Sequence, residues 1–255
     1  VKVAKAESAH VRAQYLVQMP SPAMDPYGLL ANPSVIQLYT DLRADNERYA
    51  LALHDRLRSA GITASVEAID VFAEARASMV GHGAQLADLA LVPARPADTL
   101  QVPCWRDLAI GVLMRSGRPM LMVPMDKELP WPPQRICVAW KSTRESSRAL
   151  YDAIPLMTRG ATVQVLRAGT AASLAKDPVE PLLTYLSHHG IKAESVDLDT
   201  SAALAGQAIV DYALSVHADL IVAGGYGHSR LREWVLGGVS RQLLENSGIP
   251  VLMSH

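Results

Sequence analysis

The sequence predicts an α/β protein made of two tandem doubly wound parallel-sheet domains. The first observation behind this prediction is alternation, because short apolar runs typical of buried strands alternate with longer runs of helical spacing. The second is a duplication, because segments of the first half return in the second half in the same order. Together they indicate one α/β unit that is present twice.

Three pairs of segments carry the duplication. They are residues 87–92 with 218–223, 116–122 with 247–253, and 57–62 with 186–191. The offset is 131 residues for the first two pairs (219 − 88 and 247 − 116) and 129 for the third (190 − 61). We therefore predict a first domain over residues 1–124, a proline-containing linker over 125–134 and a second domain over 135–255.

The second half divides into strands and helices in strict alternation. Hydrophobic periodicity predicts strands over residues 135–140, 162–166, 192–198, 219–223 and 250–253. It predicts helices over residues 145–158, 178–188, 202–216 and 229–245. In such a sheet, ligands bind at the carboxyl ends of the strands, where the strand order reverses.

The first half follows the same order but begins later in the unit. Residues 1–7 are typical of the end of a helix, residues 11–17 of a strand and residues 35–59 of a long helix. The opening strand of this repeat is therefore expected to be absent from the chain, and the repeat is degenerate. Because the chain begins at Val1 without methionine, we also expect sequence upstream.

Composition narrows the functional class. The 255 residues are 49% hydrophobic and carry a net charge of −1, which argues against a generic nucleic-acid or membrane surface. No apolar run reaches the roughly 18 residues of a membrane span, and no signal peptide is visible. Cys104 and Cys137 lack metal-ligand spacing and are interpreted as buried thiols. We therefore expect a cytoplasmic protein.

A glycine cluster after the strand at 218–223 is the strongest functional signal. Gly224, Gly225 and Gly227 follow that strand, and a helix-like run with Gly237 and Gly238 comes next. Glycines let the backbone approach phosphate oxygens closely, with N–H groups directed at them. The cluster predicts a site for a small phosphorylated ligand.

No motif for catalysis accompanies this site. The sequence lacks a Gly-x-Ser-x-Gly elbow, a Walker A loop and a dinucleotide fingerprint, since Arg230 stands where the last needs glycine. We predict a binding protein rather than an enzyme, with at most slow ATP hydrolysis. Asp219, which is repeated as Asp88, is interpreted as a structural residue at a strand start.

The glycine pattern resembles that of the universal stress protein family, in its tandem two-domain bacterial form. The family pattern Gly-x2-Gly-x9-Gly-(Ser/Thr) is matched by Gly224, Gly227, Gly237 and Gly238. Residues 138–142 and 144–149 are also similar to the usual first strand and helix. The resemblance implies a Rossmann-like fold of the adenine-nucleotide alpha-hydrolase type, a stress-response role and ATP or AMP as ligand.

The resemblance also implies which residues form the ligand site. The nucleoside part would lie near Trp140, Lys141, Leu166 and Ala168. The ribose and phosphates would lie near Gly224, Gly225, Gly227, His228, Ser229, Arg230, Gly237, Gly238, Val239 and Ser240. Trp140 can alternatively belong to the core. Mg²⁺ is expected only if the ligand is ATP.

Two positions depart from the family pattern. Lys141 stands where the family has an Asp that contacts the nucleoside, so an acceptor is replaced by a cation that can only donate, for instance to a phosphate. Gly238 stands where the family has Ser or Thr, and Ser240 is the nearest hydroxyl that follows. The alternative function is therefore a stress scaffold or chaperone-like protein that binds no nucleotide.

The first repeat has lost the glycine pattern. Pro93 and Pro96 correspond to Gly224 and Gly227, and proline has no N–H to donate. Arg106 and Asp107 correspond to Gly237 and Gly238. We predict that this half binds no nucleotide. The resemblance implies that it pairs with the second half through the final strands, residues 120–123 and 251–253, because dimers of the family pair through that strand. The pair would form a pseudo-dimer within one chain, and pseudo-dimers can associate further as homodimers.

Overall fold

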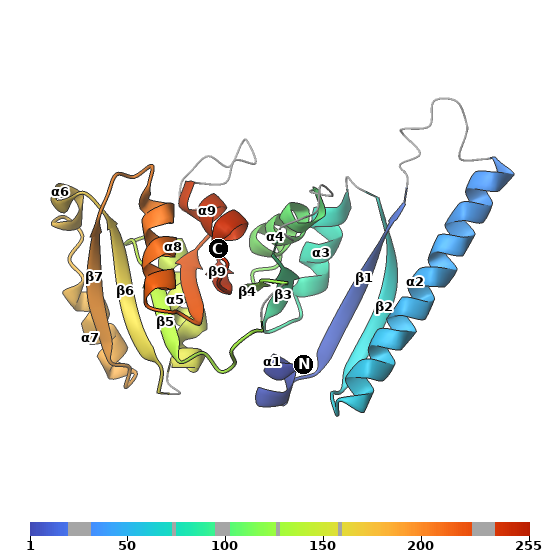
Figure 1. Ribbon diagram of the computed structural model, residues 1–255, viewed down its shortest axis with the longest axis horizontal. Helices are drawn as coiled ribbons and strands as arrows, with labels where there is room; N and C mark the ends of the chain where they lie inside the picture. The colour runs from blue at the N-terminus through green and yellow to red at the C-terminus, as the bar shows by residue number, and fades with distance from the viewer. Residues whose placement is uncertain (20–31, 73–74, 95–102, 126–127, 158–159, 226–237) are drawn as a thin grey trace. The chain divides into compact units, whose positions relative to one another are not determined.

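The computed structural model describes residues 1–19, 32–72, 75–94, 103–125, 128–157, 160–225 and 238–255. The chain forms two compact units, Val1–Met79 and Val80–His255 (Figure 1). No helix among the described residues is both long enough and apolar enough to cross a membrane.

The first unit holds one long helix against a parallel pair of strands. Its elements are α1 (Lys2–Ala6), β1 (Val11–Met19), α2 (Pro33–Ser59), β2 (Ala64–Phe72) and the beginning of α3 (Arg76–Ala84). The strands β1 and β2 pair in parallel from Val11↔Ala64 to Met19↔Phe72. The Asn32 side chain caps α2 by accepting a hydrogen bond from the backbone N–H of Ser34 at 2.9 Å. The predicted helix end, strand and long helix of this half are confirmed.

The second unit is built on a seven-stranded sheet. Its strands are β3 (Ala90–Pro93), β4 (Met120–Val123), β5 (Arg135–Ala139), β6 (Thr162–Gly169), β7 (Ala193–Asp199), β8 (Leu220–Gly224) and β9 (Val251–Ser254). They lie in the order β3-β4-β9-β8-β5-β6-β7, and each neighbouring pair is parallel except β4 with β9. The predicted doubly wound α/β class is therefore confirmed.

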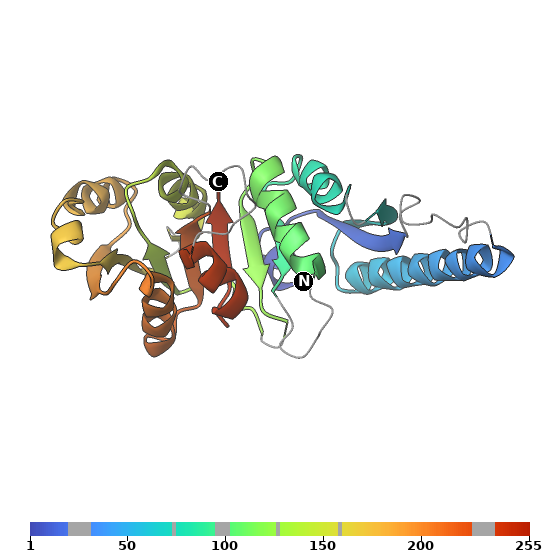
Figure 2. The same cartoon turned by 90° about the horizontal axis from the view of Figure 1, so that it is seen from above.

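Helices cover both faces of this sheet. They are α4 (Pro103–Arg115), α5 (Arg144–Met157), α6 (Ala171–Leu174), α7 (Glu180–His188), α8 (Ala205–Ser215) and α9 (Gly238–Asn246). One core cluster joins the sheet to α5 and α7, and another joins it to α4, α8 and α9. Figure 2 shows α5 and α7 on one side of the strands and α8 and α9 on the other. The sequence predicted α5, α7 and α8 to within a few residues, and α9 as far as the described residues reach, whereas α4 and α6 were not predicted.

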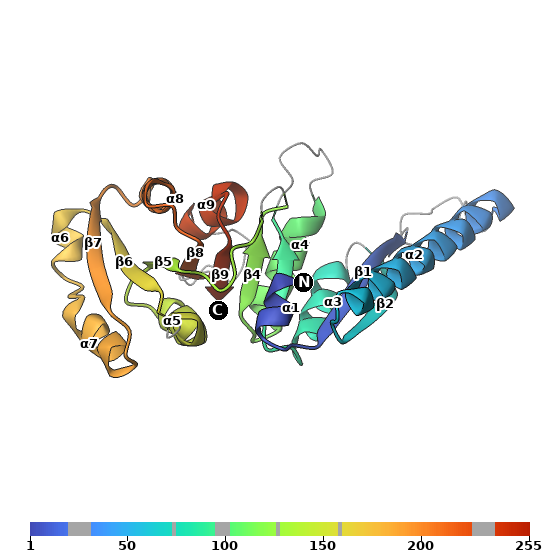
Figure 3. The same cartoon turned by 60° about the horizontal axis from the view of Figure 1, so that its bottom comes forward.

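The seam between β4 and β9 joins the two repeats. Leu121 pairs with Leu252 in antiparallel register, and both side chains are buried in the same core cluster. Figure 3 shows the strands β4 and β9 side by side. An ion pair between Arg106 of α4 and Glu245 of α9 lies across this seam. The predicted pairing of the final strands is confirmed, so a pseudo-dimer interface exists within one chain.

The compact units do not coincide with the sequence repeats. The strands β3 and β4 belong to the first repeat by sequence, yet they continue the sheet of the second unit. In the predicted linker, residues 125 and 128–134 contain neither helix nor strand. The boundaries 1–124, 125–134 and 135–255 stay a prediction.

Cys137 lies in the middle of β5, where its thiol is buried. Burial raises the pKa of this thiol to about 11 from an ordinary value of 9.0. At pH 8 the thiolate is therefore about a hundredfold scarcer than in an exposed cysteine. We expect iodoacetamide to leave Cys137 unmodified in the folded protein and to modify it in urea, as read by peptide mass spectrometry. Rapid modification of the folded protein would contradict this burial.

Candidate functional site at the carboxyl ends of the strands

The register of the sheet brings the ends of three strands together. Ala139 of β5 lies opposite Leu166 of β6 on one side and Ala223 of β8 on the other. The chain leaves β5 toward β6 and β7 and then crosses to β8, so the strand order reverses between β5 and β8. Ligands in doubly wound sheets bind at this reversal. Lys141 and Gly224, which the sequence placed in the site, lie there.

Gly224 ends β8 directly against the first turn of α5. A Cβ atom at this position would lie 2.6 Å from the backbone nitrogen of Ser146 and 2.7 Å from the carbonyl carbon of Glu145. Both contacts are with backbone atoms, which cannot rotate away. The absence of a side chain at Gly224 is therefore needed for the packing of α5 on the sheet, independently of any ligand.

Gly225 is held by the end of the chain. Its N–H donates to the carbonyl oxygen of Ser254 at 2.8 Å, and its own carbonyl oxygen lies 3.0 Å from Nδ1 of His255. The nearest atoms to a Cβ at Gly225 would be 3.5 Å away, an ordinary contact distance. The N–H group of Gly225 is thus committed to β9 rather than directed at a ligand.

The first turn of α5 forms the wall beside Gly224. Thr143 stabilises this turn, because its hydroxyl oxygen accepts from the N–H of Ser146 at 3.3 Å. Burial alone would raise the pKa of the neighbouring Glu145 carboxyl. Hydrogen bonds from its own backbone N–H and the Thr143 hydroxyl, together with Arg144, outweigh burial and hold that pKa below its ordinary value. The wall therefore carries a buried carboxylate.

The residues expected around the nucleoside are only partly accessible. The backbone N–H of Trp140 donates to the carbonyl oxygen of Leu166 at 2.9 Å. The Trp140 side chain packs against the core cluster that contains α5 and α7. The Leu166 side chain is fully buried. The strand β6 continues to Gly169, three residues beyond the predicted end at 166. Ala168, which is half-buried near the end of β6, is thus closer to the strand end than Leu166.

A carboxylate that the sequence analysis missed also reaches this site. The Oδ2 atom of Asp177, in the connection between α6 and α7, accepts from the backbone N–H of Ser142 at 3.0 Å. Ser142 directly follows Lys141. The position of Asp177 depends on how residues 170–179 fold over the ends of β6 and β7, and no periodic pattern in the sequence reports that.

The structure describes only some of the remaining residues of the predicted site. Gly227, His228, Ser229, Arg230 and Gly237 are outside the described residues. Gly238 begins α9, and a Cβ atom added there would have no neighbour within 4 Å among the residues that the structure describes. Val239 is half-buried, and Ser240 is buried inside the helix.

The counterpart positions in the first repeat have structural surroundings. Pro93 is the last residue of β3, and Pro96 lies outside the described residues. Arg106 and Asp107 lie within α4, where Arg106 pairs with Glu245 and stacks 5.7 Å from the Trp105 ring centre. The positions that match Gly237 and Gly238 therefore belong to a helix, and the position that matches Gly224 belongs to a strand.

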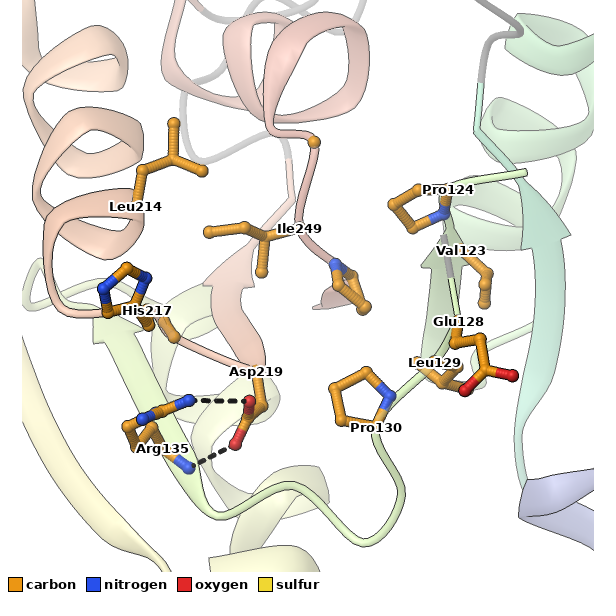
Figure 4. A pocket seen from close by; sticks show the side chains of 13 residues that line it. Val123, Pro124, Glu128, Leu129, Pro130, Arg135, Leu214, His217, Asp219 and Ile249 are labelled. Atoms are coloured by element: carbon orange, nitrogen blue, oxygen red, sulfur yellow. Dashed lines mark hydrogen bonds and ion pairs between the residues drawn. The ribbon is translucent and has the colours of Figure 1, made fainter. Parts of the chain in front are cut away.

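A cavity of about 300 Å³ lies at the opposite edge of the sheet, away from the strand reversal. Figure 4 shows Arg135 and Asp219 on one wall and Pro130 on another. Asp219 accepts hydrogen bonds from the backbone N–H groups of Gln134 and Arg135, both at 2.9 Å. It thereby fixes the start of β5, which agrees with the structural role predicted for this repeated residue.

The fold and the strand reversal define a doubly wound, Rossmann-like α/β protein. The sequence pattern of the universal stress protein family matches residues 133–255, and this part of the chain belongs to that family. No curated protein matches the sequence.

Solved structures extend the likeness of fold to nearly the whole chain. A universal stress protein from Archaeoglobus fulgidus DSM 4304 superposes with a TM-score of 0.71 at 16% identity, over 96% of this chain and 87% of that one. A protein of unknown function from Pseudomonas aeruginosa PAO1 superposes with a TM-score of 0.55 at 14% identity, over 98% of this chain and 94% of that one. At these identities the likeness concerns the fold.

Proposed function

We propose that this protein is a stress-response protein that binds ATP, AMP or a related phosphorylated ligand at the carboxyl ends of β5, β6 and β8. The observation that carries the proposal is the placement of Lys141 and Gly224 on both sides of the strand reversal. The family of residues 133–255 supports the stress-response role.

Lys141 is a cation that follows β5 close to this reversal. Its side chain is exposed, and it follows β5 at the edge where a doubly wound sheet receives its ligand. An ammonium group donates charge-assisted hydrogen bonds to phosphate oxygens. The residue that departs from the family pattern thus supplies the charge that a phosphorylated ligand requires.

Isothermal titration of the full chain with AMP, and with ATP in the presence and absence of Mg²⁺, tests the proposal. Replacing Lys141 by Met should weaken binding about tenfold, because a charge-assisted hydrogen bond contributes about 1.5–3 kcal/mol. The matched control is Lys192→Met, which removes the same charge just before β7, at the opposite edge of the sheet. An absence of heat at millimolar nucleotide would reject nucleotide binding.

A second candidate function is a stress scaffold or chaperone-like protein without a nucleotide. Gly224 packs closely on α5, and the Gly225 N–H donates to β9. These contacts favour the scaffold function, because they explain both glycines without a ligand. A folded protein that gives no titration heat would support this function. Phosphate release from ATP above that of a heat-treated sample would instead indicate slow hydrolysis.

A further inference from the structure

We infer that Asp177 is the acceptor that receives hydrogen bonds from the nucleoside part of the ligand. This inference rests on the proposed function and concerns the same site. The Lys141 side chain has no acceptor atom, so it cannot replace the family's Asp in accepting a bond from a ribose hydroxyl or a base amine. Asp177 brings a carboxylate to that place from a different element.

The Asp177 carboxylate is fixed at one oxygen and open at the other. Its Oδ2 accepts the Ser142 N–H at 3.0 Å, while Oδ1 takes no hydrogen bond from any described residue. The residue is half-buried rather than extended into solvent. An ionised carboxylate has about four acceptor positions on its two oxygens, so Asp177 keeps acceptor capacity for a ligand.

The backbone beneath Asp177 is also fixed. A guanidinium nitrogen of Arg167 donates to the Asp177 carbonyl oxygen at 2.6 Å. The Arg167 guanidinium is held in turn by the Asp197 carboxylate through two bonds of 2.7 and 2.6 Å, and only 12% of the Arg167 side chain is exposed. The carboxylate therefore has a defined position before a ligand arrives, which lowers the entropy lost on binding.

Lys141 and Asp177 would then bind different parts of the ligand. The ammonium group suits an anionic phosphate, whereas the carboxylate suits neutral hydrogen-bond donors and repels phosphate. Because Asp177 contacts the residue next to Lys141, the two charges lie on neighbouring positions at the end of β5. A nucleoside phosphate carries both kinds of group, and its ribose hydroxyls or exocyclic amine would donate to Oδ1.

A merely structural role for Asp177 makes a different prediction. If Asp177 served only to hold the Ser142 N–H, asparagine would replace it well, because its amide oxygen can accept that bond. The amide nitrogen would then occupy the second position and could only donate. The variant Asp177→Asn therefore preserves the loop and removes the outward acceptor.

We expect Asp177→Asn to weaken AMP binding at least tenfold in isothermal titration of the full chain. The matched control is Asp199→Asn, which removes the same charge from an exposed residue at the end of β7, on the same edge. The control should bind AMP within twofold of the wild type. Thermal unfolding of both variants should stay within a few degrees of the wild type.

Three further ligands identify the donor and separate the outcomes. If the ribose donates, the wild type should prefer AMP to 2′-deoxy-AMP, and if the amine donates, it should prefer AMP to IMP. Ribose 5-phosphate should bind as well as AMP if the ribose alone provides the donors. Asp177→Asn should lose the preference that the wild type shows. Unchanged AMP affinity, or weaker binding with the preferences intact, overturns the inference alone. A wild type that binds none of these ligands overturns both the inference and the proposed function.

Discussion

Replacing Gly224 with alanine should lower the free energy of unfolding by about 2–3 kcal/mol. The added methyl group would lie 2.6 Å from the Ser146 nitrogen and 2.7 Å from the Glu145 carbonyl carbon. Because these are backbone atoms of a packed helix, the strain can be relieved only by moving the first turn of α5 away from β8. Urea unfolding followed by circular dichroism measures the change.

Gly225→Ala is the matched control for this prediction. The two glycines are neighbours, but a Cβ at Gly225 would meet atoms only at 3.5 Å and beyond. We expect a loss of less than about 1 kcal/mol in this variant, in the range of an ordinary substitution. Equal stability of the two variants would show that α5 does not press on Gly224 as described.

The glycine cluster illustrates what a sequence pattern can reveal about a site. The pattern correctly predicted that Gly224 follows a buried strand at the edge where ligands bind. It did not indicate that the same glycine accommodates the backbone of α5, because that contact joins residues nearly 80 positions apart. Spacing along the chain reports local geometry, whereas close approach between elements depends on how they pack.

The fold was more predictable than the site. Alternating apolar runs predicted the strands β5 to β9, and the family resemblance predicted that β4 would pair with β9, its equivalent at an offset of 131 (251 − 120). The extension of β6 to Gly169 and the short helix α6 were not predicted. Asp177 lies in the irregular connection that follows them, where hydrophobic periodicity carries no information.

The charged residues near the end of β5 differ from the family pattern, because position 141 is a lysine and the nearby carboxylate belongs to Asp177. Read alone, a lysine at the end of β5 indicates a site that has lost its nucleoside contact. The bond from the Ser142 N–H to Asp177 shows that a carboxylate is nevertheless present beside it. If Asp177 contacts the ligand as we propose, the site keeps a carboxylate although a different element supplies it.

The stability of the second unit should be sensitive to substitutions at the seam between the repeats. Leu121→Ala and Leu252→Ala should each lower the free energy of unfolding by about 3 kcal/mol, because both side chains are at most 1% exposed and would leave cavities. Leu214→Ala, at a residue that is 44% exposed, should cost less than about 1 kcal/mol. Urea unfolding of the three variants provides the comparison.

The double variant Leu121→Ala, Leu252→Ala tests whether the two repeats stabilise each other across the seam. Leu121 and Leu252 are direct partners across β4 and β9, so their effects should be non-additive by about 0.5–1 kcal/mol or more. Additive losses would mean that each leucine stabilises only its own repeat. A significant coupling energy would instead mean that β4 of the first repeat stabilises β9, and with it the end of β8 that carries Gly224. The first repeat, which lacks the glycines, would then stabilise the second repeat, which retains them.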